Sequence, residues 1–178
     1  MLSNDPLPSA TIANWDSEKK GVFAWSPSRT LLASLRNYQN WKSRGRSGRL
    51  PCKIALTRRR FSSILTGCDL SINSEIGGGL LIPHRNGNVI FPACQIRPKC
   101  HIFQYFTSGS NKSNTRSGVP TLGGRVDLGE DAKIVGSIFV GNNAVTGANA
   151  VVLTDVPANI VAMVISLRVI SSTDREVS

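Results

Sequence analysis

The chain of 178 residues contains two histidines, His84 and His101. Imidazole is the side chain whose charge changes near neutral pH, so a positioned histidine can take a proton from an attacking hydroxyl. His84 follows an aliphatic run and precedes a glycine in the stretch LIPHRNG, residues 81–87. The alternative interpretation is a loop histidine bonded to a nearby carbonyl. His101 stands inside an aliphatic hexapeptide, and we interpret it as structural.

A repeat of six residues surrounds these histidines. Neither a helix, with period 3.6, nor a strand, with period 2, produces a strict six, whereas a parallel β-helix does. The first ladder at this spacing, with five aliphatic residues of six, is Leu122, Leu128, Ile134, Val140, Thr146 and Val152, and a small or aliphatic residue follows four places after most of them. A second ladder is Ile64, Leu70, Ile76 and Ile82 and, after a slip of two residues, Ile90, Ile96 and Ile102. The period predicts a coil of short strands.

Three of the four cysteines fit the same repeat. Cys68, Cys94 and Cys100 each stand four places after a ladder isoleucine, where a tight corner takes a small buried side chain. The fourth is Cys52, and no pair has CxxC spacing. We therefore predict free thiols and no metal site, because two histidines seventeen residues apart cannot supply three imidazole ligands.

The segments around the coil have different compositions. Leucines and aromatic residues recur at helical spacing in residues 26–44, with Ser28 as a plausible N-cap, and residues 54–65 favour a second helix. We expect both helices to cover the open end of the coil. The predicted division is a basic, partly helical segment 1–63, a β-helix domain 64–157 with a polar loop 107–121, and a C-terminal tail 158–178.

The net charge of +10 is concentrated at one end of the chain. Residues 1–60 hold twelve Lys and Arg against three acidic residues, which we interpret as a solvated helix face rather than a nucleic-acid site. No apolar run reaches the roughly 18 to 20 residues that span a bilayer. The N-terminus lacks the charged-then-apolar order of a signal peptide. These observations favour a cytoplasmic protein without a membrane span.

From about Thr66 to Pro157 the chain resembles the hexapeptide-repeat acyltransferases, and among them the serine O-acetyltransferases and relatives that acetylate sugars. The stretches that carry the resemblance are TGCDLSINSEIGGGLLIPHRNGNVI, CHIFQYFTSGS and GVPTLGGRVDLGEDAKIVGSIFVGNNAVTGANAVVLTDVP. GANAVVLTDVP is specific for the superfamily but not for the acceptor. The resemblance implies a mainly β fold, a left-handed parallel β-helix with a short α-helical N-terminal segment.

The resemblance also implies roles for individual residues. His84 matches the general base, and Asp69, fifteen residues earlier, matches the carboxylate that orients it. The implied co-substrate is acetyl-CoA, held in the groove between subunits of a homotrimer or a dimer of trimers. Gly109, Ala148 and Arg168 match its contacts.

Some family positions are not kept in this chain. Pro83 stands where the serine enzymes have an aspartate that contacts the amino acid, and Gly118 and Val119 stand where they have arginine and histidine. Beyond the last coil, Arg168 alone keeps the family pattern. We therefore predict an O-acetyltransferase whose acceptor is L-serine, with a sugar or surface polysaccharide as the alternative. A non-catalytic β-helix scaffold or nucleic-acid binder is the second alternative. The presence of two histidines argues against a carbonic anhydrase, whose metal is held by three histidines.

Overall fold

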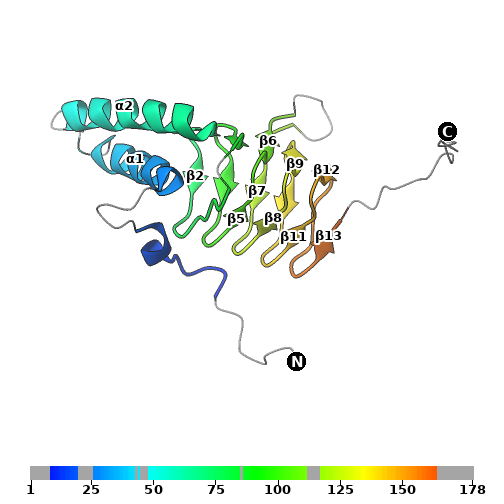
Figure 1. Ribbon diagram of the computed structural model, residues 1–178. Coiled ribbons are helices and arrows are strands. Elements are labelled where there is room, and N and C mark those ends of the chain that lie inside the picture. The colour runs from blue at the N-terminus through cyan, green and yellow to red at the C-terminus, as the bar shows by residue number, and fades with distance from the viewer. Residues whose placement is uncertain are drawn as a thin grey trace, which may run out of the picture.

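The computed structural model describes residues 9–19, 26–42, 44, 48–84, 86–111 and 117–163. It opens with a short 3₁₀ helix η1 and two α-helices, followed by short strands that run to the end of the described chain (Figure 1). The helices are η1 (Trp15–Glu18), α1 (Pro27–Lys42) and α2 (Arg49–Thr66).

The strands form three parallel sheets, here called A, B and C. Sheet A contains β1 (Asp69–Leu70), β3 (Val89–Ile90), β6 (Thr107–Gly109), β9 (Lys133–Val135) and β12 (Val151–Val152). Sheet B contains β2 (Glu75–Ile76), β4 (Gln95–Ile96), β7 (Thr121–Leu122) and β10 (Phe139–Val140). Sheet C contains β5 (His101–Ile102), β8 (Asp127–Leu128), β11 (Val145–Thr146) and β13 (Val161–Ala162). Successive strands, together with the isolated bridges at Leu81 and Val156, visit the sheets in turn, so the chain winds as a parallel β-helix.

The strand register gives the length of each turn of the coil. Thr121 pairs with Phe139, eighteen residues on, as three steps of six require. Asp69 pairs with Val89, twenty residues on, which confirms the two-residue slip before β3. Gln95 pairs with Thr121, twenty-six residues on, because the polar loop adds eight residues to that turn.

The predicted ladder residues form the core, with one exception. From Leu70 to Val152 the ladder residues are at most 8% exposed, and Cys68, Cys94 and Cys100 are buried as predicted. Ile64 lies in α2 and is 81% exposed, so its assignment to the ladder was wrong. Its spacing is coincidental, because α2 continues to Thr66 and ends at Gly67 in the left-handed region (φ 62°) before the coil begins.

Each corner of the coil needs a sharp change of direction, and a left-handed residue often provides it. Positive φ recurs at steps of six residues in much of the coil, where Asn and Asp are frequent because they tolerate this conformation. The non-glycine residues concerned are Ala93, Lys99, Tyr105, Arg125, Asp131, Asn143, Asn149 and Asn159. The repeat therefore encodes both the buried strand residue and the turn.

The two helices cover the first-coil end, as expected (Figure 1). Leu31, Leu32 and Leu35 of α1 join the same buried cluster as the coil residues. The strands at this end have edge carbonyls with no preceding coil to pair with, and arginines of the helices donate to them. Arg36 donates to the carbonyls of Ile76 and Gly77, and Arg59 donates to that of Leu70. The arginines thus supply hydrogen-bond donors that a preceding coil would otherwise provide.

The N-terminal segment 9–19 lies against corners of the coil that are rich in glycine. The Glu18 carboxylate accepts from Arg36 at 3.0 and 3.2 Å and from the amide of Gly79 at 2.8 Å. Trp15 lies under the Arg36 guanidinium, 5.0 Å from the ring centroid. A Cβ at Gly78 would lie 2.7 Å from the Trp15 ring, so glycine is needed for this close approach.

Several predicted boundaries differ from the structure. Helix α1 begins at Pro27, so Ser28 lies inside it and is not the N-cap. Helix α2 begins at Arg49, five residues earlier than predicted. The loop predicted for residues 107–121 is shorter, because its ends form β6 and β7, and the predicted tail contains β13.

Candidate functional site

A hollow of about 330 Å³ lies between the start of α1 and the turn that leads to His84. Its walls are Ser26, Ser28, Arg29 and Leu32 from the helix end and Leu80, Leu81, Ile82 and Pro83 from the coil. The first amides of an α-helix have no intrahelical acceptor and carry a partial positive charge. Pro27, the first residue of α1, has no N–H, so the amides concerned are those of Ser28 and Arg29. The exposed Arg29 guanidinium, which also donates to the carbonyl of Lys19 at 2.9 Å, adds positive charge, and this end of the hollow suits a carboxylate.

His84 lies on the edge of the coil between sheets C and A. The preceding Leu81 bridges to His101 of sheet C, and β3 of sheet A begins at Val89. The imidazole is exposed, and its ring centroid lies 6.3 Å from that of Phe103 in the next coil. Among the described residues it has no hydrogen-bond partner, so it is accessible to a ligand.

Asp69 begins β1 of sheet A, near the edge that carries His84 one turn later. Its Oδ1 accepts from Arg59 at 3.1 Å, and its side chain is 72% exposed. The structure therefore brings Asp69 to Arg59 and forms no Asp69–His84 hydrogen bond. In the described part of the chain, the second carboxylate oxygen of Asp69 has no partner.

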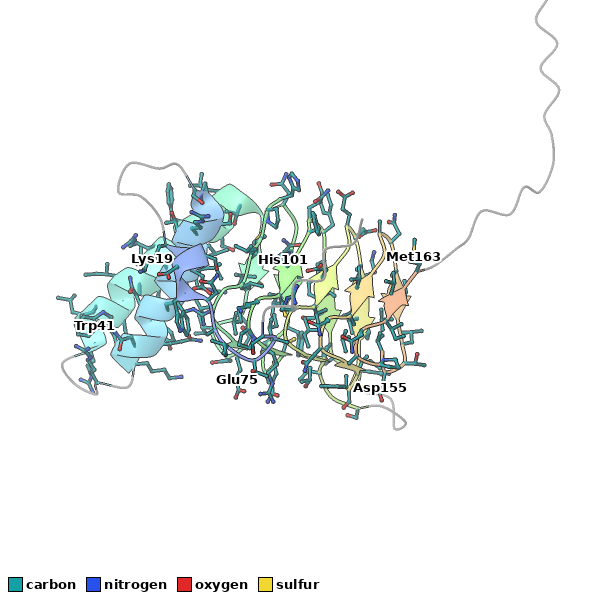
Figure 2. All side chains as sticks on the ribbon, turned by 90° about the horizontal axis from the view of Figure 1, so that it is seen from below. Lys19, Trp41, Glu75, His101, Asp155 and Met163 are labelled. Carbon is teal, nitrogen blue, oxygen red and sulfur yellow. The ribbon has the colours of Figure 1, made fainter. Side chains whose placement is uncertain are left out.

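A histidine–carboxylate pair is present on sheet C instead. Nδ1 of His101 lies 3.2 Å from Oδ1 of Asp127, the residue beside it on the adjacent strand. The pair faces a hollow of about 290 Å³ whose walls include Lys99 and Arg125. His101 lies in the middle part of the molecule, between the helices and Met163 (Figure 2). The two residues are 26 positions apart, one coil plus the eight loop residues, so adding the loop length to the repeat would have predicted the contact.

The positions predicted to contact the co-substrate lie on different parts of the coil. Ala148 is exposed on the same edge as His84, three turns later. At about 4.8 Å per turn this separation is about 14 Å along the edge. Gly109 ends β6 on sheet A. Arg168 lies outside the described residues.

Small residues on this edge also have a structural cause. A Cβ at Gly129 would lie 2.6 Å from the backbone nitrogen of Ala148, so successive corners stack closely. The repeat therefore requires glycine at 129 whatever passes along the edge.

The positions that depart from the family pattern carry no charge that could take over the expected contacts. Pro83 is exposed beside His84. Gly118 has φ +137° and exchanges two backbone hydrogen bonds with Asn111, which closes the loop at its base. Val119 is half-buried.

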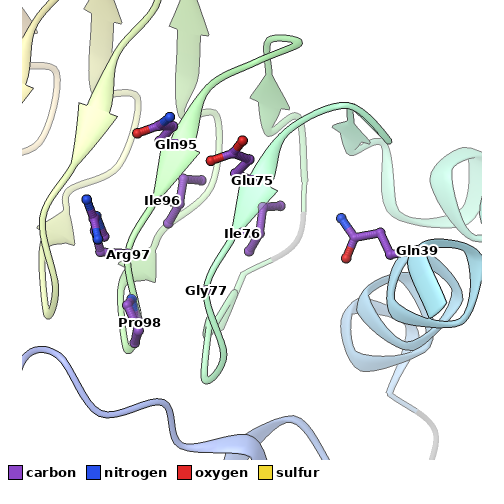
Figure 3. A pocket seen from close by; sticks show the side chains of 8 residues that line it. All are labelled: Gln39, Glu75, Ile76, Gly77, Gln95, Ile96, Arg97 and Pro98. Carbon is purple, nitrogen blue, oxygen red and sulfur yellow. The ribbon is translucent and has the colours of Figure 1, made fainter. Parts of the chain in front are cut away.

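A hollow of about 510 Å³ lies on the outer face of sheet B beside α1 (Figure 3). Glu75, Gln95 and Arg97 line it, and Gln39 faces it from the helix (Figure 3). Neither His84 nor His101 is part of it. Among the described residues, no three His, Cys, Asp or Glu side chains gather closely enough to hold a metal ion.

Three parallel sheets wound from six-residue steps define a β-helix protein of the hexapeptide-repeat type. No family model matches the chain. The serine acetyltransferase of Helicobacter pylori strain ATCC 700392 / 26695 is 36% identical over 110 residues, which are 62% of this chain and 64% of that protein. The chain thus spans less than two thirds of this relative.

Solved serine acetyltransferase structures have the same fold. One in complex with CoA is 28% identical, with a TM-score of 0.65 over 81% of this chain and 57% of the other. One in complex with cysteine is 27% identical, with a TM-score of 0.64 over 90% of this chain and 63% of the other. These findings confirm the resemblance to hexapeptide-repeat acyltransferases of the serine acetyltransferase type.

Proposed function

We propose that the chain is a left-handed parallel β-helix O-acetyltransferase that transfers the acetyl group of acetyl-CoA to a hydroxyl, with L-serine as the favoured acceptor. The observation that carries the proposal is its similarity in sequence and fold to serine acetyltransferases, including structures bound to CoA and to cysteine. Cysteine differs from serine only in sulfur for oxygen, so a site that holds one suits the other.

In the proposed reaction, His84 takes the proton of the acceptor hydroxyl while its oxygen attacks the thioester carbonyl. The carbon–sulfur bond then breaks, and the proton passes from His84 to the leaving thiolate. Asp69 would hold the imidazolium through its second oxygen while Arg59 keeps the first. The edge that carries His84 and Ala148 would receive the pantetheine arm, with Gly109 and Arg168 as further contacts.

The hollow before His84 supports an amino-acid acceptor. Pro83, Gly118 and Val119 lack the charges of the family's ionic contacts. The Arg29 guanidinium and the first amides of α1 after Pro27 offer a carboxylate site beside the base. A neutral sugar would not use this positive charge. A sugar or surface polysaccharide is the second candidate acceptor, favoured by the missing ionic contacts.

The active assembly is proposed to be a homotrimer. Val89 and Val151 of sheet A are 38% and 52% exposed, and Leu153, which follows β12, is 60% exposed, as a subunit contact would require. Light scattering would then give a mass of three times 19.2 kDa, about 58 kDa.

The test is release of CoA thiol from acetyl-CoA with serine, homoserine and sugar acceptors. We expect turnover with serine and a loss of about 10² to 10⁴ in kcat for His84→Ala. The matched variant is His101→Ala, which removes the other imidazole and is expected to retain turnover. Full activity in His84→Ala with loss in His101→Ala would move the base to the His101–Asp127 pair. A wild-type chain inactive with every acceptor would favour the scaffold.

A further inference from the structure

Helix α2 exposes five large apolar side chains along its whole length. Leu50, Ile54, Phe61, Ile64 and Leu65 are 69%, 54%, 64%, 81% and 47% exposed. At 3.6 residues per turn they fall within about 100° of one face, opposite the side that α2 buries against the molecule. We call these five residues the apolar stripe.

Basic side chains border the apolar stripe on both sides. The same helical geometry places Arg49, Lys53 and Arg60 along one border and Arg58 along the other. No carboxylate among the described residues forms an ion pair with any of these four. Residues 19–68 contain twelve Lys and Arg and no Asp or Glu, so the whole helical end is cationic.

The apolar surface continues from α2 onto α1. A hollow of about 190 Å³ lies between the helices, and its walls include Leu50, Ile54 and Trp41. Trp41 lies at the helical end of the molecule, and Met163 lies at the opposite end (Figure 2). Helix α2 lies on the outer side of the helical end (Figure 1), and the five side chains of the stripe are exposed in the described part of the chain. Indole rings are common at boundaries between apolar and wet surroundings.

We propose that the apolar stripe and its basic borders dock this protein on an anionic lipid surface. A basic helix with one apolar face lies in the plane of the membrane interface, with apolar groups among the acyl chains and cations against lipid phosphates. The described part of the chain has no helix long and apolar enough to cross a membrane. The inference thus concerns surface attachment and does not depend on the acetyl-transfer proposal.

Charge and shape argue against two other occupants. A second copy docked through the same stripe would bring the four basic residues of each chain together without a carboxylate to compensate them. A nucleic acid would use the cations, but its phosphate backbone would leave the five apolar side chains without a partner. An anionic lipid surface offers acyl chains to the apolar side chains and phosphates to the basic ones.

The test is co-sedimentation of the full chain with vesicles of phosphatidylcholine, with or without phosphatidylglycerol. We expect binding to the anionic vesicles only, and weaker binding as sodium chloride is raised. The double variant Phe61→Ser/Ile64→Ser should lower the partition coefficient more than about tenfold. Arg58→Gln and Arg60→Gln should lower it about fivefold each.

The matched control is Ile160→Ser/Met163→Ser, which removes two exposed apolar side chains at the opposite end of the molecule. It should bind vesicles as the wild type does, and circular dichroism should show that both double variants are folded. Absence of binding to anionic vesicles would overturn the proposal. Normal binding of the stripe variant to anionic vesicles would also overturn it. A changed sedimentation coefficient of the stripe variant would overturn it as well, because the stripe would then hold a second copy of the chain. We expect wild type and stripe variant to transfer acetyl groups at equal rates, so that a loss of vesicle binding can be distinguished from a loss of catalysis.

Discussion

Removal of the Glu18 carboxylate is a direct test of how the N-terminal segment holds the helical end on the coil. The side chains of Glu18 and Arg36 are 10% and 20% exposed, and the carboxylate also accepts from the amides of Gly79 and Leu80. Glu18→Ala would leave a mostly buried guanidinium and two amides without this acceptor. Breaking a buried pair from one side costs about 3 to 5 kcal/mol, and the partial exposure of Arg36 places the expected loss near the lower figure.

Urea unfolding followed by circular dichroism measures this loss. We expect Glu18→Ala to lower the free energy of unfolding by about 3 kcal/mol. Asp16→Ala, which removes an exposed ion pair with Lys19 in the same segment, should leave the midpoint unchanged. The double variant Glu18→Ala/Arg36→Met should be less destabilised than the sum of its single variants by at least about 1 kcal/mol. Equal midpoints for wild type and Glu18→Ala would refute the reasoning.

The remaining predictions concern the core, the thiols and the acceptor hollow. Leu128→Ala, at a fully buried ladder position, should lower the free energy of unfolding by about 3 kcal/mol in the same assay, whereas Val161→Ala at the exposed end should change it little. Burial raises the pKa of Cys94 to about 11 and of Cys100 to about 12, and Cys68 is buried as well, so a thiol reagent at neutral pH should modify the half-exposed Cys52 and reach the other three cysteines only after unfolding. Above pH 9.0, the ordinary pKa of a thiol, cysteines of the unfolded chain lose protons that the buried native thiols keep. The free energy of unfolding should therefore fall as pH rises above 9.0, and it should fall less in Cys100→Ala. Arg29→Gln should raise KM for serine and leave kcat nearly unchanged, and an unchanged KM would place the acceptor carboxylate elsewhere.

Much of the coil could be predicted because its repeat is local. Each group of six residues carries its own buried aliphatic side chain and often its own left-handed turn residue, so the strands, the slip before Val89 and the buried thiols follow from spacing alone. The same spacing misassigned Ile64, because six-residue steps continue into α2 by coincidence. A periodic pattern does not by itself show at which residue the repeat begins.

The contacts of the histidines could not be predicted in the same way. The family resemblance implied a pair between Asp69 and His84, but the Asp69 carboxylate contacts Arg59 of α2. His101 was interpreted as structural, yet it lies beside Asp127 because the loop shifts the register by eight residues. The hollow that contains Arg29 depends on how α1 packs on the first coil, and no local pattern encodes that orientation.

The amino-acid sequence by itself determined the coil, its core and the basic character of the helical end, since period, residue size and charge act locally along the chain. The tertiary structure alone decided that arginines of the helices bind the edge carbonyls, that Glu18 joins the N-terminal segment to the coil, and that α2 leaves an apolar stripe uncovered. These features join residues far apart in the chain. Their formation depends on how the helices pack against the coil, which the spacing of residues within either part does not specify.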